Sequence, residues 1–165
     1  IAQQLYEGVD VGSGTVGLIT YMRTDSFSMA AEAVMQIREY VKKNFEADYL
    51  PKSPIMYKTK SKSAQEAHEA IRPTDITRTP AKVRQFLTDE QFKLYEMIWK
   101  RALACQMSPA KFDAVSVDLS VGSEANLFRA TGQTLIFPGF IVVYMEGRDD
   151  EEEEGESKLP HLETG

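Results

Sequence analysis

The stretch "GLITYMRTDS", residues 17–26, decides the fold, because an apolar run there meets a polar one. Residues 18–22 combine β-branched and aromatic side chains between a glycine and the polar "RTDS", a pattern that predicts a short strand. Alternate residues of a strand point to the same face. Tyr21 and Arg23 are therefore expected to project together where this strand ends.

The pairing of Tyr21 with Arg23 suits attack on a phosphodiester. A phenol, with a pKa of about 10, is a weak nucleophile at neutral pH, and a nearby cation that lowers this pKa favours the reactive phenolate. An arginine also holds a phosphate through its planar array of N–H donors. Both residues are candidate catalytic groups. The alternative, a partly buried strand tyrosine beside a surface arginine, stays open at this point.

Helical patterns surround this stretch. Residues 1–8 are predicted to be helical, and the glycine-rich "VDVGSGTVG", residues 9–17, to be a loop. Ser28 is the predicted N-cap of a helix whose apolar residues recur with helical spacing up to residue 41. A short helix is expected at residues 63–71, ending near Arg72 because Pro73 disfavours helical dihedrals in the preceding residue.

The clearest predicted helix begins with "TDEQ", residues 88–91, which has the capping-box pattern. It follows a predicted turn at residues 80–86 and should continue to about residue 107. Its apolar residues share one side, which places Trp99 in the core. These side chains are Phe92, Tyr95, Trp99 and Ala102.

After Lys111 the period of the apolar residues changes from about four to two. Three strands are predicted: "FDAVSVDLSV", "NLFRATGQTLIF" and "GFIVVYME". The expected fold class is α+β. It comprises a mainly helical domain with Tyr21 at residues 1–110, a short antiparallel β segment at 111–145 and an acidic, disordered tail at 146–165.

Composition excludes several classes of protein. The chain has 165 residues, 42% of them hydrophobic, which is enough for a core. Cys105 is its one cysteine, so it forms no internal disulfide and no thiolate zinc site, and it is expected inside a helix. No apolar run is long enough to cross a bilayer, and we expect a cytoplasmic protein without a membrane partner. The opening "IAQQLYEG" reads as a helix already under way, which suggests a piece of a larger protein.

The net charge of −6 hides an asymmetry. Residues 149–156 hold seven acids and no base, whereas residues 1–145 hold 17 basic and 16 acidic residues. Residues 52–84 carry eight bases against three acids and form a candidate anion-binding surface. Its bases are Lys52, Lys58, Lys60, Lys62, Arg72, Arg78, Lys82 and Arg84.

His68 lies within this basic region, in "AQEAHEAIRPT", residues 64–74. Arg72, four residues on, would share its helical face if the helix persists, and the two could converge on an anion. A structural, hydrogen-bonded histidine is the alternative. The HExxH pattern is absent, which excludes a zinc peptidase of that kind, and His161 has no such neighbours.

Together, "GLITYMRTDS" and "SAQEAHEAIRPT" resemble the paired signatures of type IA DNA topoisomerases. "YMRTDS" and "HEAIRPT" are more similar to the bacterial topoisomerase I branch than to the topoisomerase III branch. "LYEMIWKRALACQMSPA", residues 94–110, is similar to the helix that follows in this family. The resemblance covers most of residues 1–145.

The resemblance implies an ATP-independent enzyme that relaxes negatively supercoiled DNA. Tyr21 would attack a phosphodiester of single-stranded DNA and become linked to the 5′ phosphate, and the free 3′ hydroxyl would reverse the linkage after strand passage. Arg23 would support this chemistry. His68 would contact DNA near the scissile phosphate, and Arg72, Lys58, Lys60 and Lys62 are the further candidate DNA-binding residues.

The resemblance also implies parts that this chain lacks. In the family an upstream toprim domain supplies a catalytic glutamate, a lysine and the "DxDxE" carboxylates that bind Mg²⁺, and no "DxDxE" occurs here. We therefore expect no metal site in the chain and no activity from it alone. Residues 1–110 resemble domain III of the toroid, and the strands resemble part of its arch. Their partners would lie elsewhere, and the exposed edges would also permit dimerisation.

A second reading belongs to another class of protein. The chain would be a single-stranded nucleic-acid-binding module in which Tyr21 is structural and the basic region contacts phosphates. It predicts salt-sensitive binding that is indifferent to Tyr21→Phe.

Overall fold

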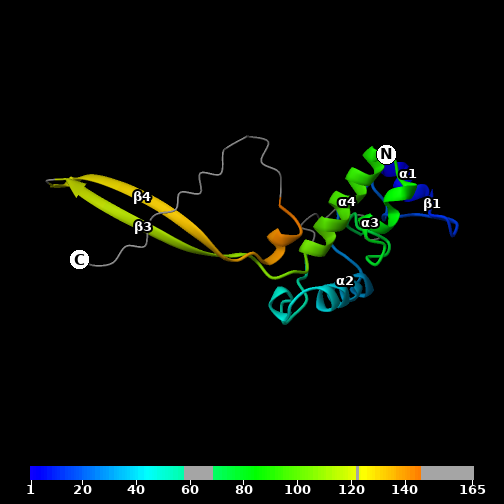
Figure 1. Ribbon diagram of the computed structural model, residues 1–165, viewed down its shortest axis with the longest axis horizontal. Coiled ribbons are helices and arrows are strands. Elements are labelled where there is room, and N and C mark those ends of the chain that lie inside the picture. Colours follow the sequence, from blue (N-terminus) through cyan, green and yellow to red (C-terminus); the bar gives the residue numbers. More distant parts are fainter. Residues whose placement is uncertain (58–68, 122, 146–165) are drawn as a thin grey trace. The chain divides into compact units, whose positions relative to one another are not determined.

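The computed structural model describes residues 1–57, 69–121 and 123–145, without the side chains of residues 121–127. The chain divides between Ser108 and Pro109 into two compact units (Figure 1). The first unit is helical, and the second contains the long strands.

The helical unit contains four α-helices, one small hairpin and two 3₁₀ turns in the residues that the structure describes. The hairpin lies within the stretch predicted as a loop, and that prediction was wrong. None of the described helices combines the length and apolar character needed to cross a membrane. The elements are α1 (Ala2–Glu7), β1 (Val9–Asp10), β2 (Thr15–Val16), α2 (Ala31–Asn44), η1 (Ala47–Tyr49), α3 (Pro80–Val83), η2 (Arg84–Phe86) and α4 (Asp89–Ala104).

Helix α4 is the centre of this unit, and α1, α2 and α3 all pack against it. Its predicted capping box is confirmed: the Gln91 amide donates to Thr88 Oγ1 over 3.3 Å, and the Thr88 amide donates to Gln91 Oε1 over 3.0 Å. The side chains of Tyr95 and Trp99 are buried, as the helical spacing predicted. The fully or nearly buried apolar side chains are Leu5, Leu18, Ile19, Val34, Ile37, Val41, Ile76, Val83, Tyr95, Leu103 and Met107.

The end of α4 comes a few residues earlier than predicted. Cys105 is the C-cap instead of an interior helical residue, and its thiol donates to the Ala102 carbonyl over 2.9 Å. Burial raises the pKa of this thiol to about 11, so it is protonated at neutral pH. The fully buried Gln106 side chain then holds both backbone groups of Ile55, at 3.1 and 2.8 Å. These bonds tie the end of α4 to the segment that follows η1.

Helix α2 buries the apolar face that its sequence predicted, with Val34, Ile37 and Val41 in the core. It begins at Ala31, however, and Ser28 is not its N-cap. The Ser28 hydroxyl pairs with the Ser26 hydroxyl at 2.8 Å. The N-cap residue is Ala30, and its side chain makes no capping hydrogen bond.

The predicted strand at residues 18–22 was wrong. Instead, the described part of the chain has one isolated β-bridge, between Ile19 and Pro73, and the chain bends at residues 22 and 23. The pairing does not extend into a ladder, because the Arg72 amide donates to the Thr20 hydroxyl instead of the Thr20 carbonyl, and the Leu18 amide donates to the Leu5 carbonyl. Of the helix predicted at residues 63–71, residues 63–68 lie outside the described residues, and residues 69–71 are not helical.

The second unit contains β3 (Lys111–Val121) and β4 (Ser123–Phe137), which pair antiparallel. Asp118 lies opposite Arg129, and their side chains form two hydrogen bonds of 2.6 and 2.9 Å. Two of the three predicted strands are therefore confirmed. The third was wrong: Pro138 is in the helical region, Gly139 has φ 50°, and a 3₁₀ turn, η3 (Gly139–Val142), follows.

Candidate active site

The two sequence motifs lie side by side in the helical unit. The Thr20 amide donates to the Arg72 carbonyl over 2.9 Å, and the Thr74 amide donates to the Leu18 carbonyl over 3.0 Å. The Thr74 hydroxyl adds a 2.7 Å bond to the Gly17 carbonyl. Residues about fifty positions apart in the sequence are thus joined next to Tyr21.

Thr20, the residue before Tyr21, is bonded through its side chain as well. Its hydroxyl donates to the Ala70 carbonyl over 2.8 Å and accepts the Arg72 amide over 3.0 Å. These bonds are partly buried and involve both backbone and side chain. The backbone immediately before Tyr21 is therefore held in one position against the second motif.

Tyr21 lies on the surface, with 37% of the residue exposed. Its ring meets the ring of Tyr6 from α1, with the ring centroids 5.4 Å apart and the planes at 70°. The backbone also approaches α1, since the Leu18 amide donates to the Leu5 carbonyl over 2.7 Å. A Cβ at Gly17 would lie 2.5 Å from the Tyr6 carbonyl oxygen, so only glycine permits this approach.

Arg23 is also exposed, but it does not lie on a strand. The chain bends at residues 22 and 23, so the alternation of side chains along a strand does not place Arg23 beside Tyr21. Beyond the bend, the Ser26 amide donates to Thr24 Oγ1 over 3.0 Å, a local turn of the kind that serine and threonine favour. Tyr21 thus stands at the junction between a tightly bonded segment and an irregular one.

Arg72 forms a partly buried ion pair with Glu69. Its Nε lies 2.7 Å from Glu69 Oε2, and its Nη1 donates to the Pro73 carbonyl over 3.0 Å. The Arg72 side chain is 14% exposed, so much of its guanidinium already has protein partners. Glu69 Oε2 also accepts the Ala30 amide over 3.2 Å, at the N-terminus of α2, where a negative charge is favourable. This pair links the second motif to α2.

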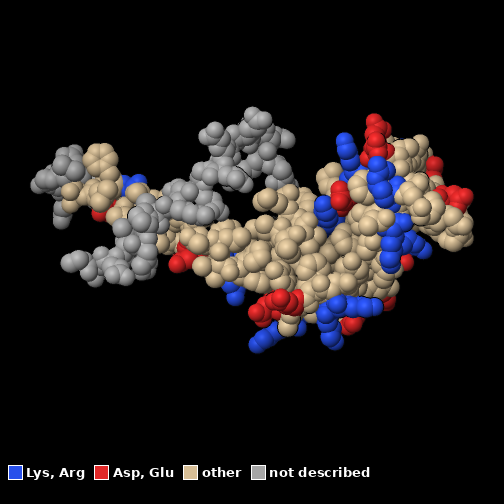
Figure 2. Space-filling model, in the orientation of Figure 1, with Lys and Arg blue, Asp and Glu red and all other residues tan. Residues whose placement is uncertain are grey.

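The predicted DNA-binding residues His68, Lys58, Lys60 and Lys62 lie outside the described residues. Of the remaining bases in the predicted surface, Arg84 pairs with Asp89 and lies 4.7 Å from the Phe92 ring centroid. Figure 2 shows basic and acidic side chains interspersed over the helical unit. On the face shown in Figure 2, the described basic side chains therefore do not form one continuous patch.

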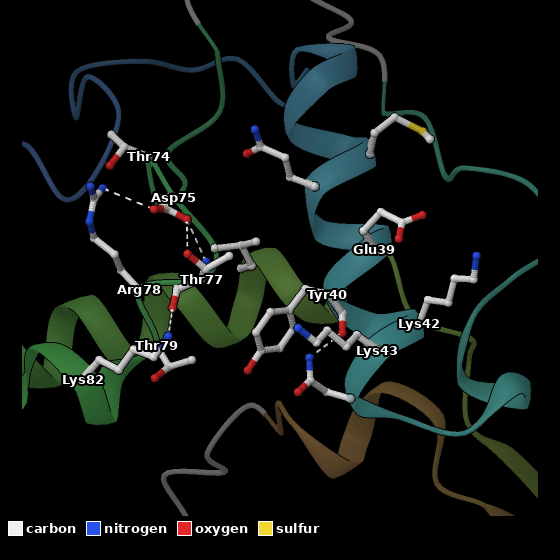
Figure 3. A pocket seen from close by; sticks show the side chains of 14 residues that line it. Glu39, Tyr40, Lys42, Lys43, Thr74, Asp75, Thr77, Arg78, Thr79 and Lys82 are labelled. Atoms are coloured by element: carbon white, nitrogen blue, oxygen red, sulfur yellow. Dashed lines mark hydrogen bonds and ion pairs between the residues drawn. The ribbon is translucent and has the colours of Figure 1, made fainter.

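A groove of about 1180 Å³ lies between α2 and residues 74–82 (Figure 3). Sequence reasoning missed the two lysines that α2 contributes to it, although "KK" in the last turn of a predicted helix is a visible signal. Across the groove, Arg78 lies 3.7 Å from Asp75, and Lys82 donates to the Thr77 carbonyl over 3.0 Å. The charged side chains that line the groove are Glu39, Lys42, Lys43, Asp75, Arg78 and Lys82.

No described cluster of three or more His, Cys, Asp or Glu side chains is arranged to hold a metal ion.

Replacing Glu69 by glutamine should destabilise the helical unit at neutral pH but not in acid. The hydrogen bond from Arg72, with the Ala30 amide, holds the pKa of Glu69 below its ordinary value of 4.5. The folded state therefore binds fewer protons than the unfolded state, and ionised Glu69 stabilises it. This stabilisation is complete above about pH 4.5 and is lost as the pH falls through the lower, folded pKa.

Thermal unfolding measured from pH 7 to pH 3 tests this prediction. The difference in midpoint between the native chain and Glu69→Gln should shrink as the pH falls. Glu39→Gln removes an exposed carboxylate from α2 and controls for loss of charge alone. A Glu69→Gln difference that stays constant over this range would contradict the role of the ion pair.

Comparison with known proteins identifies the family of this chain. A family model described as DNA topoisomerase matches residues 1–165, and the chain belongs to this family. Two relatives within this family are bacterial proteins. The chain is 50% identical over 169 residues to DNA topoisomerase 1 of Xylella fastidiosa strain 9a5c, covering 100% of this chain and 21% of that protein. It is 51% identical over 162 residues to DNA topoisomerase 1 of Rickettsia felis, covering 98% of this chain and 21% of that protein.

A solved structure shows the same fold. Full-length topoisomerase I from Thermotoga maritima aligns with a TM-score of 0.73 and 36% identity, over 93% of this chain and 24% of that one. The predicted resemblance to the type IA family and its bacterial topoisomerase I branch is confirmed, as is the α+β class. The chain spans about a fifth of the length of its curated relatives.

Proposed function

We propose that this chain is the tyrosine-bearing part of a type IA topoisomerase that relaxes negatively supercoiled DNA. The observation that carries the proposal is the direct bonding between the two motifs. Thr20 is fixed by Ala70 and Arg72, and an exposed tyrosine follows it immediately. A nucleophile needs both a fixed backbone and access to its substrate.

In the proposed reaction, Tyr21 Oη attacks a phosphorus atom of single-stranded DNA. A bond forms between Oη and phosphorus while the bond from phosphorus to the 3′ oxygen breaks. The phenol gives up its proton, and the departing 3′ oxygen gains one. The protein is then linked to the 5′ phosphate, another strand passes through the gap, and the 3′ hydroxyl reverses the step.

Arg23 has the chemistry to assist this reaction. A guanidinium stays charged at neutral pH and donates two parallel hydrogen bonds to phosphate oxygens. Its exposure leaves it accessible to a strand lying over Tyr21. We propose that Arg23 binds the scissile phosphate and that His68 contacts the neighbouring DNA. The lysines at positions 58, 60 and 62 would bind the backbone, and Arg72 would support this surface through Glu69.

The proposed reaction also requires groups that we place in other parts of a longer protein. The "DxDxE" pattern that the resemblance assigns to Mg²⁺ does not occur in this sequence, so the residues present do not fit that site. We place the Mg²⁺ ligands in a toprim domain outside this chain and expect the chain alone to be inactive. Two paired strands alone are marginal in water, and Leu119, Phe128 and Ile136 are exposed on them. We therefore propose that the remaining arch strands cover this hairpin.

The same proposal places the protein in the bacterial cytoplasm, on the nucleoid.

The polarity of cleavage tests the proposed function. Residues 1–165 would replace the matched segment of the Xylella fastidiosa protein, and this chimera would be mixed with single-stranded DNA labelled at either end, with Mg²⁺. After denaturation, the protein should remain attached to the 3′-labelled fragment, and the 5′-labelled fragment should be free. Attachment to the 5′-labelled fragment would contradict the mechanism. Absence of cleavage by a folded chimera that binds the DNA would favour the binding module.

A further inference from the structure

The side chain of Tyr6 is an aromatic neighbour of Tyr21. The two rings meet edge to face, at 5.4 Å and 70°, although the residues lie on different elements. We propose that Tyr6 is a positioning residue, which holds the Tyr21 phenol in the orientation required for attack on phosphorus. The inference rests on the proposed function, because it assumes that Tyr21 is the nucleophile.

Tyr6 belongs to a helix that is firmly held. Leu5, its neighbour on α1, is fully buried, and its carbonyl accepts the amide of the fully buried Leu18. At the same helix, Gln4 Oε1 accepts Gln91 Nε2 over 3.1 Å, which joins α1 to the first turn of α4. The ring of Tyr6 is thus attached to the core of the unit and does not depend on a loop for its position.

The same contacts fix the distance between Tyr6 and the segment that carries Tyr21. The Leu18 amide bonds to α1, and the absent side chain of Gly17 allows that backbone to approach the Tyr6 carbonyl. Both tyrosines are therefore attached to one bonded framework. Their rings meet because these contacts set the distance between α1 and the segment that carries Tyr21.

A contact that orients Tyr21 matters for catalysis because the chain bends immediately after this residue. A side chain at the surface has several staggered rotamers available, and only some of them direct the phenol toward a given phosphate. An edge-to-face aromatic contact favours one ring orientation, since the positive ring edge meets the negative ring face. Attack requires a near-attack geometry, and a displacement of about 1 Å can cost about a hundredfold in rate.

Single-turnover cleavage of single-stranded DNA by the chimera tests this inference. Tyr6→Ala should slow cleavage by about ten- to a hundredfold while leaving the Kd for an uncleaved DNA within about twofold. Tyr6→Phe keeps the ring and should cleave at close to the native rate. Tyr57→Ala is the matched control, because Tyr57 is 44% exposed, as Tyr6 is 40% exposed, and its hydroxyl bonds to the Cys105 carbonyl at the opposite end of α4.

Three results would overturn the inference: native cleavage by Tyr6→Ala, equal loss in Tyr6→Phe and Tyr6→Ala, or a loss confined to Kd. The first would show that the ring is dispensable, the second that the hydroxyl acts, and the third that Tyr6 binds DNA. If Tyr6→Ala unfolds, Tyr6→Leu, which keeps apolar volume without a ring, takes its place with the same expectation. Cleavage that persists in Tyr21→Phe would instead refute the proposed function, which separates the two failures.

Discussion

Replacing Trp99 by alanine is expected to lower the free energy of unfolding of the helical unit by about 3–5 kcal/mol. Trp99 is only 8% exposed, and its ring lies 5.5 Å from the Tyr40 ring, edge to face. Its Nε1 donates to the Ile76 carbonyl over 2.9 Å in a buried position. The substitution therefore leaves a large cavity and removes the partner of a buried carbonyl.

Two further variants separate these contributions. Trp99→Phe keeps an aromatic ring but cannot donate to Ile76, so we expect a smaller loss, of about 1–3 kcal/mol. Met97→Ala, at a position on α4 that is 53% exposed, should change stability by no more than about 0.5 kcal/mol. Urea unfolding followed by the circular dichroism of the helices measures all three. An unfolding midpoint for Trp99→Ala equal to the native one would contradict the core position.

The sequence predicted the helices well where the signal is local. Thr88 and Gln91 are three residues apart, and the capping box needs no information from elsewhere in the chain. The buried faces of α2 and α4 likewise follow from spacing along one helix. Family membership could also be predicted, because it depends on the residues of the two motifs, and these are all visible in the sequence.

The incorrect predictions have physical causes. Residues 18–22 have the composition of a strand, but a strand also needs a partner along its length. Here the amides that would extend the pairing bond elsewhere: Arg72 to the Thr20 hydroxyl and Leu18 to the Leu5 carbonyl. In the stretch predicted as the third strand, the positive φ of Gly139 turns the chain into η3. The N-cap at Ser28 failed because its hydroxyl bonds to Ser26.

The candidate site was predictable only in part. The position of Tyr21 in its motif identified it, but its contact with Tyr6 depends on how α1 packs. The bonds from Thr20 to Ala70 and Arg72 cross about fifty residues of sequence, which no local pattern encodes. Gly17 is the one local signal, since a glycine at the start of an apolar run can mark a close approach between backbones.

Replacing Tyr21 by phenylalanine is expected to have the largest effect on activity. The change removes the one oxygen that would attack phosphorus and keeps the ring that meets Tyr6. Covalent attachment to DNA by the chimera should fall by about a thousandfold or more, while stability and DNA binding change little. The alternative binding module predicts that native and Tyr21→Phe proteins behave alike in every assay.

The most direct measurement is to locate the DNA attachment in the chimera by mass spectrometry of the trapped adduct. Trypsin cleaves after Arg23, and no lysine or arginine precedes it in this chain, so one peptide contains both Tyr6 and Tyr21. Fragmentation of this peptide must therefore assign the linked residue. The account predicts a 5′-phosphotyrosyl bond on Tyr21, absent from Tyr21→Phe. A nucleotide on any other residue, or an adduct that survives Tyr21→Phe, would contradict it.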